Sequence, residues 1–118
     1  MSKRTNNFLI DDILQSINRI FTYTKNISEQ EFLNNFLIQD AVSRNFEIIG
    51  EASSRLSKEF KEYHETIDWN KVKDFRNKLI HDYFGTDYGV VWLIINNNLP
   101  DLQKNLASIQ KFFDEHTL

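Results

Sequence analysis

The sequence predicts an all-α protein, an up-and-down bundle of about four to five helices, and three observations favour this fold class. The 118 residues include only three glycines and one proline, too few turn-forming residues for a set of β-hairpins. Apolar residues recur at spacings of three and four, the period of an amphipathic helix. Capping residues stand just before several of these segments. We therefore expect one helical domain over residues 1–118.

The first helices are predicted by an apolar stripe and a capping box. Apolar residues from Phe8 to Phe21 indicate an amphipathic helix over residues 7–25. Residues 28–31, Ser-Glu-Gln-Glu, match a capping box, so a second helix begins there and pauses near Asn34 and Asn35.

A longer helix is expected from Phe36, with an apolar face that continues to Phe60. A second stripe on this helix is ionisable, and it consists of Asp40, Arg44, Glu47 and Glu51. This stripe fits a solvated face with intrahelical ion pairs, or a wall of a polar cleft.

The remaining helices are predicted from capping residues and the proline. Asp68 can cap a helix that begins at Trp69 and stops near Gly85. Asp87 can cap the next helix; its apolar run, residues 90–95, also fits a buried strand, but the cap and the lack of a partner strand favour a helix. Pro100 must kink or restart the chain before a final amphipathic helix.

Composition and charge exclude several classes of protein. Hydrophobic residues make up 41% and charged residues 26%, which excludes disordered and membrane proteins. No apolar run is long enough to span a membrane, no leader-like segment is present and cysteine is absent, so we expect a cytoplasmic protein without disulfides or thiolate sites. The net charge of −3 argues against coating nucleic acid by bulk electrostatics, but allows a compact phosphate-binding site.

Basic residues gather in one short segment of the chain. Lys71, Lys73, Arg76 and Lys78 lie close together, interrupted by Asp74. The lysines alone fit a solvated helix face.

Residues 75–85, FRNKLIHDYFG, combine a guanidinium, an imidazole and a phenol. On an ideal helix Arg76 lies about 20° from Tyr83 but about 140° from His81, whereas Asn77 and His81 share a face. For Arg76 and His81 to act on one group, either the last helical turn unwinds or a second copy of the chain supplies one of them. The second possibility predicts a homodimer.

Arginine and histidine without a metal cluster suit transesterification at a phosphodiester that bears a neighbouring hydroxyl. Histidine transfers protons near neutral pH, and the planar guanidinium stabilises charge on phosphate oxygens. The internal nucleophile is the 2′-OH, so the expected substrate is RNA and the expected products carry a 2′,3′-cyclic phosphate and a 5′-OH.

Other chemistries fit the sequence less well, although two alternatives stay open. The three histidines lack zinc-site spacing, and neither a P-loop nor a nucleophile elbow is present. A metal-dependent nuclease that uses Asp40, Glu47 and Glu51 remains possible. So does a non-catalytic helical partner, because a lone histidine in such a helix is more often structural.

The segment from Arg76 to Tyr83 reads R-x4-H-x-Y and resembles the signature of the HepT-like toxin ribonucleases of the HEPN superfamily. The resemblance extends over nearly the whole chain. It includes QDAVSRNFEIIGEA at residues 39–52, Trp69, HDYFGTD at 81–87 and VWLIINNNLPDL at 91–102.

The resemblance implies a homodimeric helical bundle with both motifs facing a cleft between protomers. It implies a toxin, a metal-independent endoribonuclease without a cofactor, in which Arg76 and His81 are the catalytic pair and Asn77 helps to orient the site. It also implies a partner, a minimal nucleotidyltransferase antitoxin that attaches AMP to Tyr83. The alternative is a non-catalytic helical partner, in which the motif serves only as a docking and modification surface for the nucleotidyltransferase.

Overall fold

The computed structural model describes the backbone of residues 3–80 and 87–116, and the side chains of residues 5–75 and 87–113. These described residues form helices and turns without a strand, which confirms the all-α class. The helices are α1 (Lys3–Thr24), α2 (Glu29–Leu33), α3 (Phe36–Arg55), α4 (Lys58–Tyr63), α5 (Trp69–Ile80), α6 (Tyr88–Asn97) and α7 (Leu99–His116). The described part of the chain thus has more helices than the four to five expected, because three of them are short.

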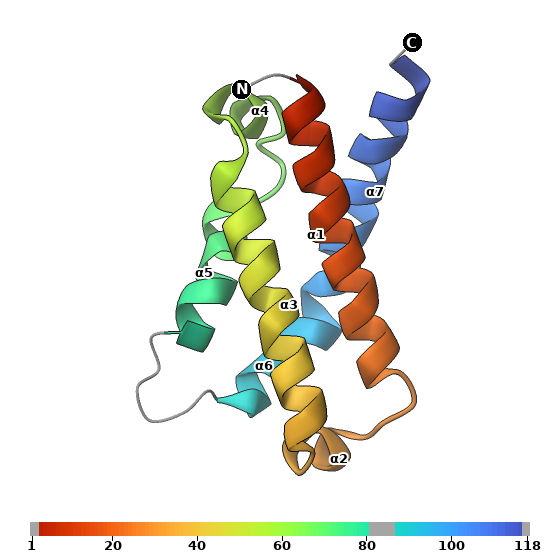
Figure 1. Cartoon of the computed structure of the whole chain (residues 1–118), viewed down its shortest axis with the longest axis vertical. Coiled ribbons are helices and arrows are strands. Elements are labelled where there is room, and N and C mark those ends of the chain that lie inside the picture. The colour runs from red at the N-terminus through yellow and green to blue at the C-terminus, as the bar shows by residue number, and fades with distance from the viewer. Residues whose placement is uncertain (1–2, 81–86, 117–118) are drawn as a thin grey trace.

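The four longest helices run alternately up and down the long axis of the molecule (Figure 1). Helices α2 and α4 lie at opposite ends of this bundle, and α6 leads into α7. Helix α3 packs most extensively against α1 and α5, and α1 also packs against α7. The helix that carries the first residues of the predicted motif, α5, is therefore attached to the central helix of the bundle.

The core is formed by apolar faces of these helices. Ile13, Ile17, Val42 and Ile49 are completely inaccessible to solvent, and Phe46 is 1% exposed. Burying each such side chain stabilises the fold by about 1.5–3 kcal/mol. Within the described residues, no helix combines the length and apolarity needed to cross a membrane.

The expected long helix from Phe36 to Phe60 is interrupted, so that prediction was wrong. Leu56 and Ser57 adopt extended backbone conformations, and the Ser57 side chain caps α4 by accepting from the Phe60 amide at 3.2 Å. The Asn6 side chain pairs with Ser57, donating to its Oγ and accepting from its amide, both at 3.1 Å. Because Asn6 is far away in the sequence, local periodicity did not reveal this break.

The predicted starts of α2, α3, α5 and α6 are confirmed, whereas α1 begins at Lys3, before the expected start at residue 7. Ser28 forms a capping box with Glu31, and the Asp87 carboxylate accepts from the amides of Gly89 and Val90 at 3.0 and 3.2 Å. Pro100 lies in the first turn of α7, where a helix does not need an amide donor. The apolar run of residues 90–95 is helical, as the aspartate cap indicated.

Candidate active site

The predicted catalytic segment is described only in part. Helix α5 includes the backbone of Arg76 and Asn77, but their side chains lie outside the described residues. All of residues 81–86, which include His81, Tyr83 and the expected stop at Gly85, also lie outside them. The roles of Arg76, Asn77, His81 and Tyr83 therefore stay predictions.

The N-terminal side of the motif is fixed to α3. The Asp68 carboxylate accepts from the Lys71 amide at 3.1 Å and so caps α5, as expected. Phe75 is 5% exposed, and its ring meets that of Phe46 edge to face with centroids 5.6 Å apart. Because Phe75 directly precedes Arg76, the helix backbone at the first motif residue is held against the bundle.

The C-terminal side of the motif is fixed at α6. The Tyr88 hydroxyl lies 3.0 Å from the Ser43 hydroxyl on α3, at hydrogen-bond distance. The Tyr88 ring also contacts the ring of Phe32 on α2, edge to face at 5.9 Å. Both sides of the motif are therefore anchored, one on α3 alone and the other on α2 and α3.

The register of α5 relates the motif to residues that are described. Positions three and four apart are neighbours on a helix surface, so the position of Lys73 neighbours those of Arg76 and Asn77. The described helix reaches Ile80, one position before His81. Whether the last turn unwinds or a second copy completes the pair therefore stays a prediction.

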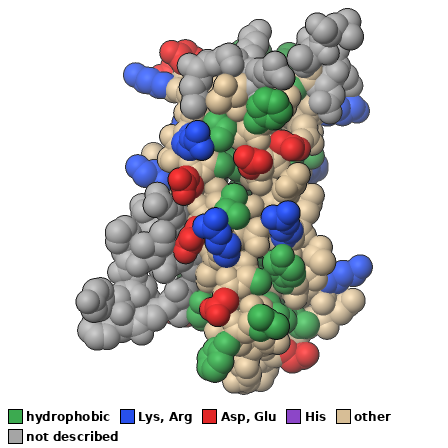
Figure 2. Space-filling model, viewed as in Figure 1, with side chains coloured by type: hydrophobic (Ala, Val, Ile, Leu, Met, Phe, Trp, Pro, Cys, Tyr) green, Lys and Arg blue, Asp and Glu red, His purple; other side chains and the backbone are tan. Residues whose placement is uncertain are grey.

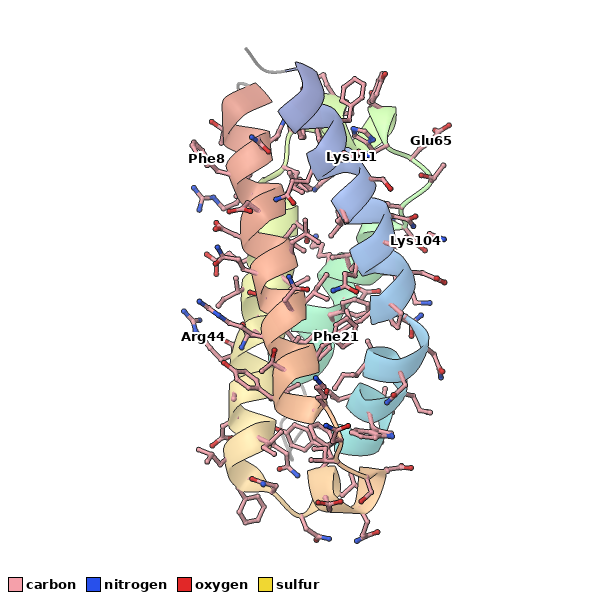
Figure 3. The ribbon with its side chains drawn as sticks, turned by 90° about the vertical axis from the view of Figure 1, so that its right-hand side faces the viewer. Phe8, Phe21, Arg44, Glu65, Lys104 and Lys111 are labelled. Atoms are coloured by element: carbon pink, nitrogen blue, oxygen red, sulfur yellow. The ribbon has the colours of Figure 1, made fainter. Side chains whose placement is uncertain are left out.

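The ionisable stripe of α3 faces solvent. Asp40, Arg44 and Glu51 are exposed, and the Arg44 guanidinium lies 3.4 Å from the carboxylate of Glu47. Acidic and basic side chains are interspersed over this face (Figure 2), and Arg44 projects outward on the opposite edge from Lys104 in the turned view (Figure 3). No three metal-ligating side chains come together among the described residues, so the α3 carboxylates do not form the metal site considered as an alternative.

A groove of about 870 Å³ lies where α4 meets the start of α5. We call it the α4–α5 groove; its lining residues are Leu56, Lys58, Lys61, Glu62, Glu65, Thr66, Ile67, Asp68, Trp69 and Asn70. The Trp69 indole donates to the backbone carbonyl of His64 at 3.1 Å, and its ring lies 6.1 Å from that of buried Phe60. These contacts hold the end of α4 against the start of α5.

We call the junction of α4 with the start of α5 the corner. Two side chains there have a lowered pKa. Partial burial, together with the charge of Lys73, lowers the pKa of the Lys61 amine. Burial against neighbouring rings lowers the pKa of the His64 imidazole. Sequence reasoning missed Lys61, because only the folded chain brings this residue of the polar connection close to Lys73 on α5.

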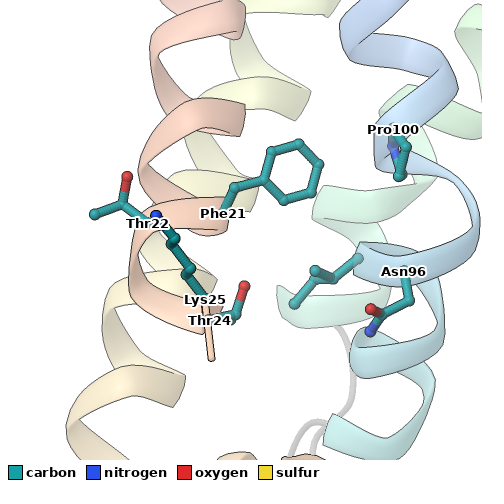
Figure 4. Close-up of a pocket in the computed structure, with 7 residues that line it drawn as sticks. Phe21, Thr22, Thr24, Lys25, Asn96 and Pro100 are labelled. Atoms are coloured by element: carbon teal, nitrogen blue, oxygen red, sulfur yellow. The ribbon is translucent and has the colours of Figure 1, made fainter. Parts of the chain in front are cut away.

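A second cleft, of about 390 Å³, lies between the end of α1 and the junction of α6 with α7. The Phe21 ring points across it toward the wall that carries Asn96 and Pro100, and Lys25 lies on the same side as Phe21 (Figure 4). Lys25 is the one ionisable residue in its described lining. This lining therefore offers no pair of ionisable groups for acid–base chemistry.

Comparison with known proteins points to one family. The family model for Ribonuclease HepT-like proteins matches residues 13–109. A protein of Methanocaldococcus jannaschii named "Putative RNase" is 42% identical over 92% of this chain and 100% of its own length. A protein of Thermococcus cleftensis named "Probable ribonuclease HepT" is 37% identical over 92% of this chain and 99% of its own length.

A longer relative shows the same region within a larger protein. It is the Methanocaldococcus jannaschii protein named "Gamma-glutamylcyclotransferase and putative RNase", 37% identical over 91% of this chain but only 48% of its own length. No solved structure shows significant similarity to this chain.

Proposed function

The chain belongs to the HepT-like ribonuclease family, and we propose that it is a metal-independent endoribonuclease that cleaves RNA by attack of the 2′-OH. The observation that carries this proposal is the family match over residues 13–109, which contains the complete R-x4-H-x-Y segment, residues 76–83. Residues 1–118 act as one domain in this proposal. The pairing of the Gln110 amide with the Asp11 carboxylate at 2.8 Å, between the last helix and the first, supports it.

In the proposed reaction, His81 transfers the proton that the 2′-OH loses or that the 5′-oxygen gains. The unperturbed pKa of a histidine side chain, near 6.5, suits either transfer at neutral pH. Arg76 stabilises the negative charge that develops on the phosphate oxygens, and Asn77 orients the site. The products are a 2′,3′-cyclic phosphate and a 5′-OH, and no metal or cofactor takes part.

We also propose that two copies pair with their motifs facing one cleft. The sequence spacing supports this arrangement, because Arg76 and His81 would point to different sides if a straight helix continued through both positions. A dimer lets the guanidinium of one copy act with the imidazole of the other. Mixing inactive Arg76→Ala and His81→Ala chains then restores part of the activity, whereas a site complete within one chain gives no restoration.

The experiment that tests the activity uses the purified full chain and RNA in the presence of EDTA. We expect cleavage to persist in the chelator and to be lost in Arg76→Ala and His81→Ala. Arg44→Ala serves as the matched arginine control, since Arg44 is exposed on α3. Cleavage that disappears with EDTA and returns with a divalent ion contradicts the mechanism. A parental protein that never cleaves RNA supports the alternative of a non-catalytic helical partner.

The biological role that we propose is that of a cytoplasmic toxin in a type II/VII-like toxin–antitoxin pair. A cognate minimal nucleotidyltransferase neutralises it by transferring AMP from ATP to the Tyr83 hydroxyl, with release of pyrophosphate. The added phosphate brings negative charge beside the basic motif and so repels the RNA backbone. Incubating the chain with ATP and the nucleotidyltransferase should attach AMP to Tyr83, which mass spectrometry detects. The same treatment should stop RNA cleavage. Tyr83→Phe should remain unmodified.

A further inference from the structure

Lys61 of the α4–α5 groove lies near a second cation, Lys73 of α5, which is not itself among the residues that line the groove. Neither amine has a carboxylate at ion-pair distance among the described side chains. Ion pairs among the described side chains join Arg44 to Glu47 and Lys58 to Glu62, and neither pair includes Lys61 or Lys73. Lys61 lines the groove together with Trp69, and Lys73 lies one helical turn after Trp69 on the same face of α5.

The two lysines are held near each other by the packing of the corner. Phe60, 8% exposed, precedes Lys61 directly and contacts the Trp69 ring. The hydrogen bond from the Trp69 indole to the His64 carbonyl joins the same two helices. The backbone of the corner therefore cannot relax to separate the two charges without breaking these contacts.

The acidic side chains of the groove are mostly engaged elsewhere. Glu62 lies 3.9 Å from the Lys58 amine, and Asp68 caps α5. Glu65 is the exposed carboxylate of the lining that has neither role. An external anion between Lys61 and Lys73 would offset their repulsion and the loss of hydration at Lys61, which together lower the pKa of that amine.

The register of α5 indicates which anion this is. Lys73 precedes Arg76 by three residues, about 4.5 Å along the helix axis, and neighbours it on the surface. A strand whose scissile phosphate is bound at Arg76 can continue along this row of positions toward the α4–α5 groove. We propose that Lys73 and Lys61 bind backbone phosphates of the RNA substrate beside the scissile linkage, so that the groove accommodates the flanking strand.

This inference rests on the proposed function and assigns positioning, not catalysis, to the two lysines. The test compares a dinucleotide, which has only the scissile phosphate, with a longer single-stranded RNA that contains the same linkage. Cleavage of both is measured over a range of salt concentrations for Lys61→Gln, Lys73→Gln and the double variant. Lys25→Gln is the matched control, because Lys25 lines the separate cleft at the end of α1.

For the dinucleotide we expect parental kcat/KM in all variants. For the longer RNA we expect KM to rise with little change in kcat, and the slope of log(kcat/KM) against log[salt] to become shallower by about 0.7 for each lysine removed. Lys61→Arg and Lys73→Arg should keep the parental slope, and Glu65→Gln should lower KM for the longer RNA.

Two results overturn the inference while the proposed function stands. One is a double variant that cleaves the longer RNA with the parental KM and salt slope. The other is a double variant that loses cleavage of both substrates equally, which would place the lysines at the scissile bond or in the folded framework. A parental protein that cleaves neither substrate overturns the proposed function and this inference together.

Discussion

The outer face of α3 and the α4–α5 groove both carry charged side chains, but their charges are arranged in different ways. On α3, a stripe of three carboxylates includes one guanidinium, and Arg44 lies 3.4 Å from Glu47, with the two side chains 69% and 38% exposed. In the groove, Lys61 is partly buried beside the like charge of Lys73. The first arrangement pairs its one cation with a carboxylate, whereas neither Lys61 nor Lys73 has a carboxylate partner among the described side chains. The row of positions that leads to the motif begins at the groove, so the proposal places the RNA on this side of α5.

The largest expected effect on RNA cleavage is that of a substitution in the motif, which follows this row of positions on α5. His81→Ala should lower RNA cleavage by about 10²- to 10⁴-fold, because it removes a group that transfers a proton in the reaction. The measurement is kcat/KM on a defined RNA, with circular dichroism to verify that the helices remain. Variants of the α3 face should retain parental kcat/KM. Parental activity in His81→Ala would contradict the proposed catalytic role of the motif.

The inner face of α3 gives the next largest effect, on stability. Phe46→Ala should lower the free energy of unfolding by about 3–5 kcal/mol, since this buried ring holds α5 through Phe75. Phe36→Ala is the matched control, because the Phe36 side chain is 78% exposed. Urea unfolding measures both. Equal losses for the two variants would contradict the described packing of α3.

A smaller effect is expected where α4 meets α5. Trp69→Phe keeps an aromatic ring but removes the donor to the His64 carbonyl, and should cost about 0.5–1.5 kcal/mol of unfolding free energy. Trp92→Phe is the matched control, since the Trp92 indole donates no described hydrogen bond while its ring packs on Phe32. If the control loses as much stability as Trp69→Phe, the indole hydrogen bond does not hold the corner.

A substitution on the outer face of α3 should have almost no effect on stability or RNA cleavage. Arg44→Gln removes an exposed ion pair with Glu47, which contributes about 0–1 kcal/mol. RNA cleavage and its salt dependence should stay at parental values, in contrast to the effect expected for Lys61→Gln. A strong loss of RNA binding in Arg44→Gln would place the substrate on α3 and reverse the comparison.

The smallest effect is a pH dependence of stability at the corner. Burial lowers the pKa of His64 below its ordinary value of 6.5, so the unfolded chain binds a proton at this residue more readily than the folded chain. Stability should therefore fall as the pH decreases through 6.5 toward the lower folded pKa, and be unaffected by His64 above this window. His64→Gln should flatten this part of a Tm–pH profile. An unchanged slope would show that His64 does not contribute to it.

Local sequence signals predicted much of the fold but not its long-range contacts. Capping by Ser28, Asp68 and Asp87 depends on residues within a few positions, and each of these caps is observed. The break before α4 depends on Asn6, which pairs with Ser57 across the bundle, and it was missed. The nearness of Lys61 to Lys73 likewise depends on how two helices pack, and it was also missed. Periodicity describes one helix at a time, so it does not report how helix ends meet.

The candidate site was predicted by different means. Residue chemistry and a family signature singled out Arg76, Asn77, His81 and Tyr83, and the family is now shown. The described structure adds the anchors on either side of the motif, at Phe75 and Tyr88. The complementation experiment with Arg76→Ala and His81→Ala tests the relative placement of the guanidinium and the imidazole.

The most direct test of the central claim is the chemistry of the ends of cleaved RNA. A defined RNA is incubated in EDTA with the parental protein or with His81→Ala, and both new ends are identified by mass spectrometry. Attack by the neighbouring hydroxyl predicts a 2′,3′-cyclic phosphate and a 5′-OH with the parental protein, and uncut RNA with the variant. Fragments with a 5′-phosphate and a 3′-OH would instead show attack by water at the phosphorus and contradict the account.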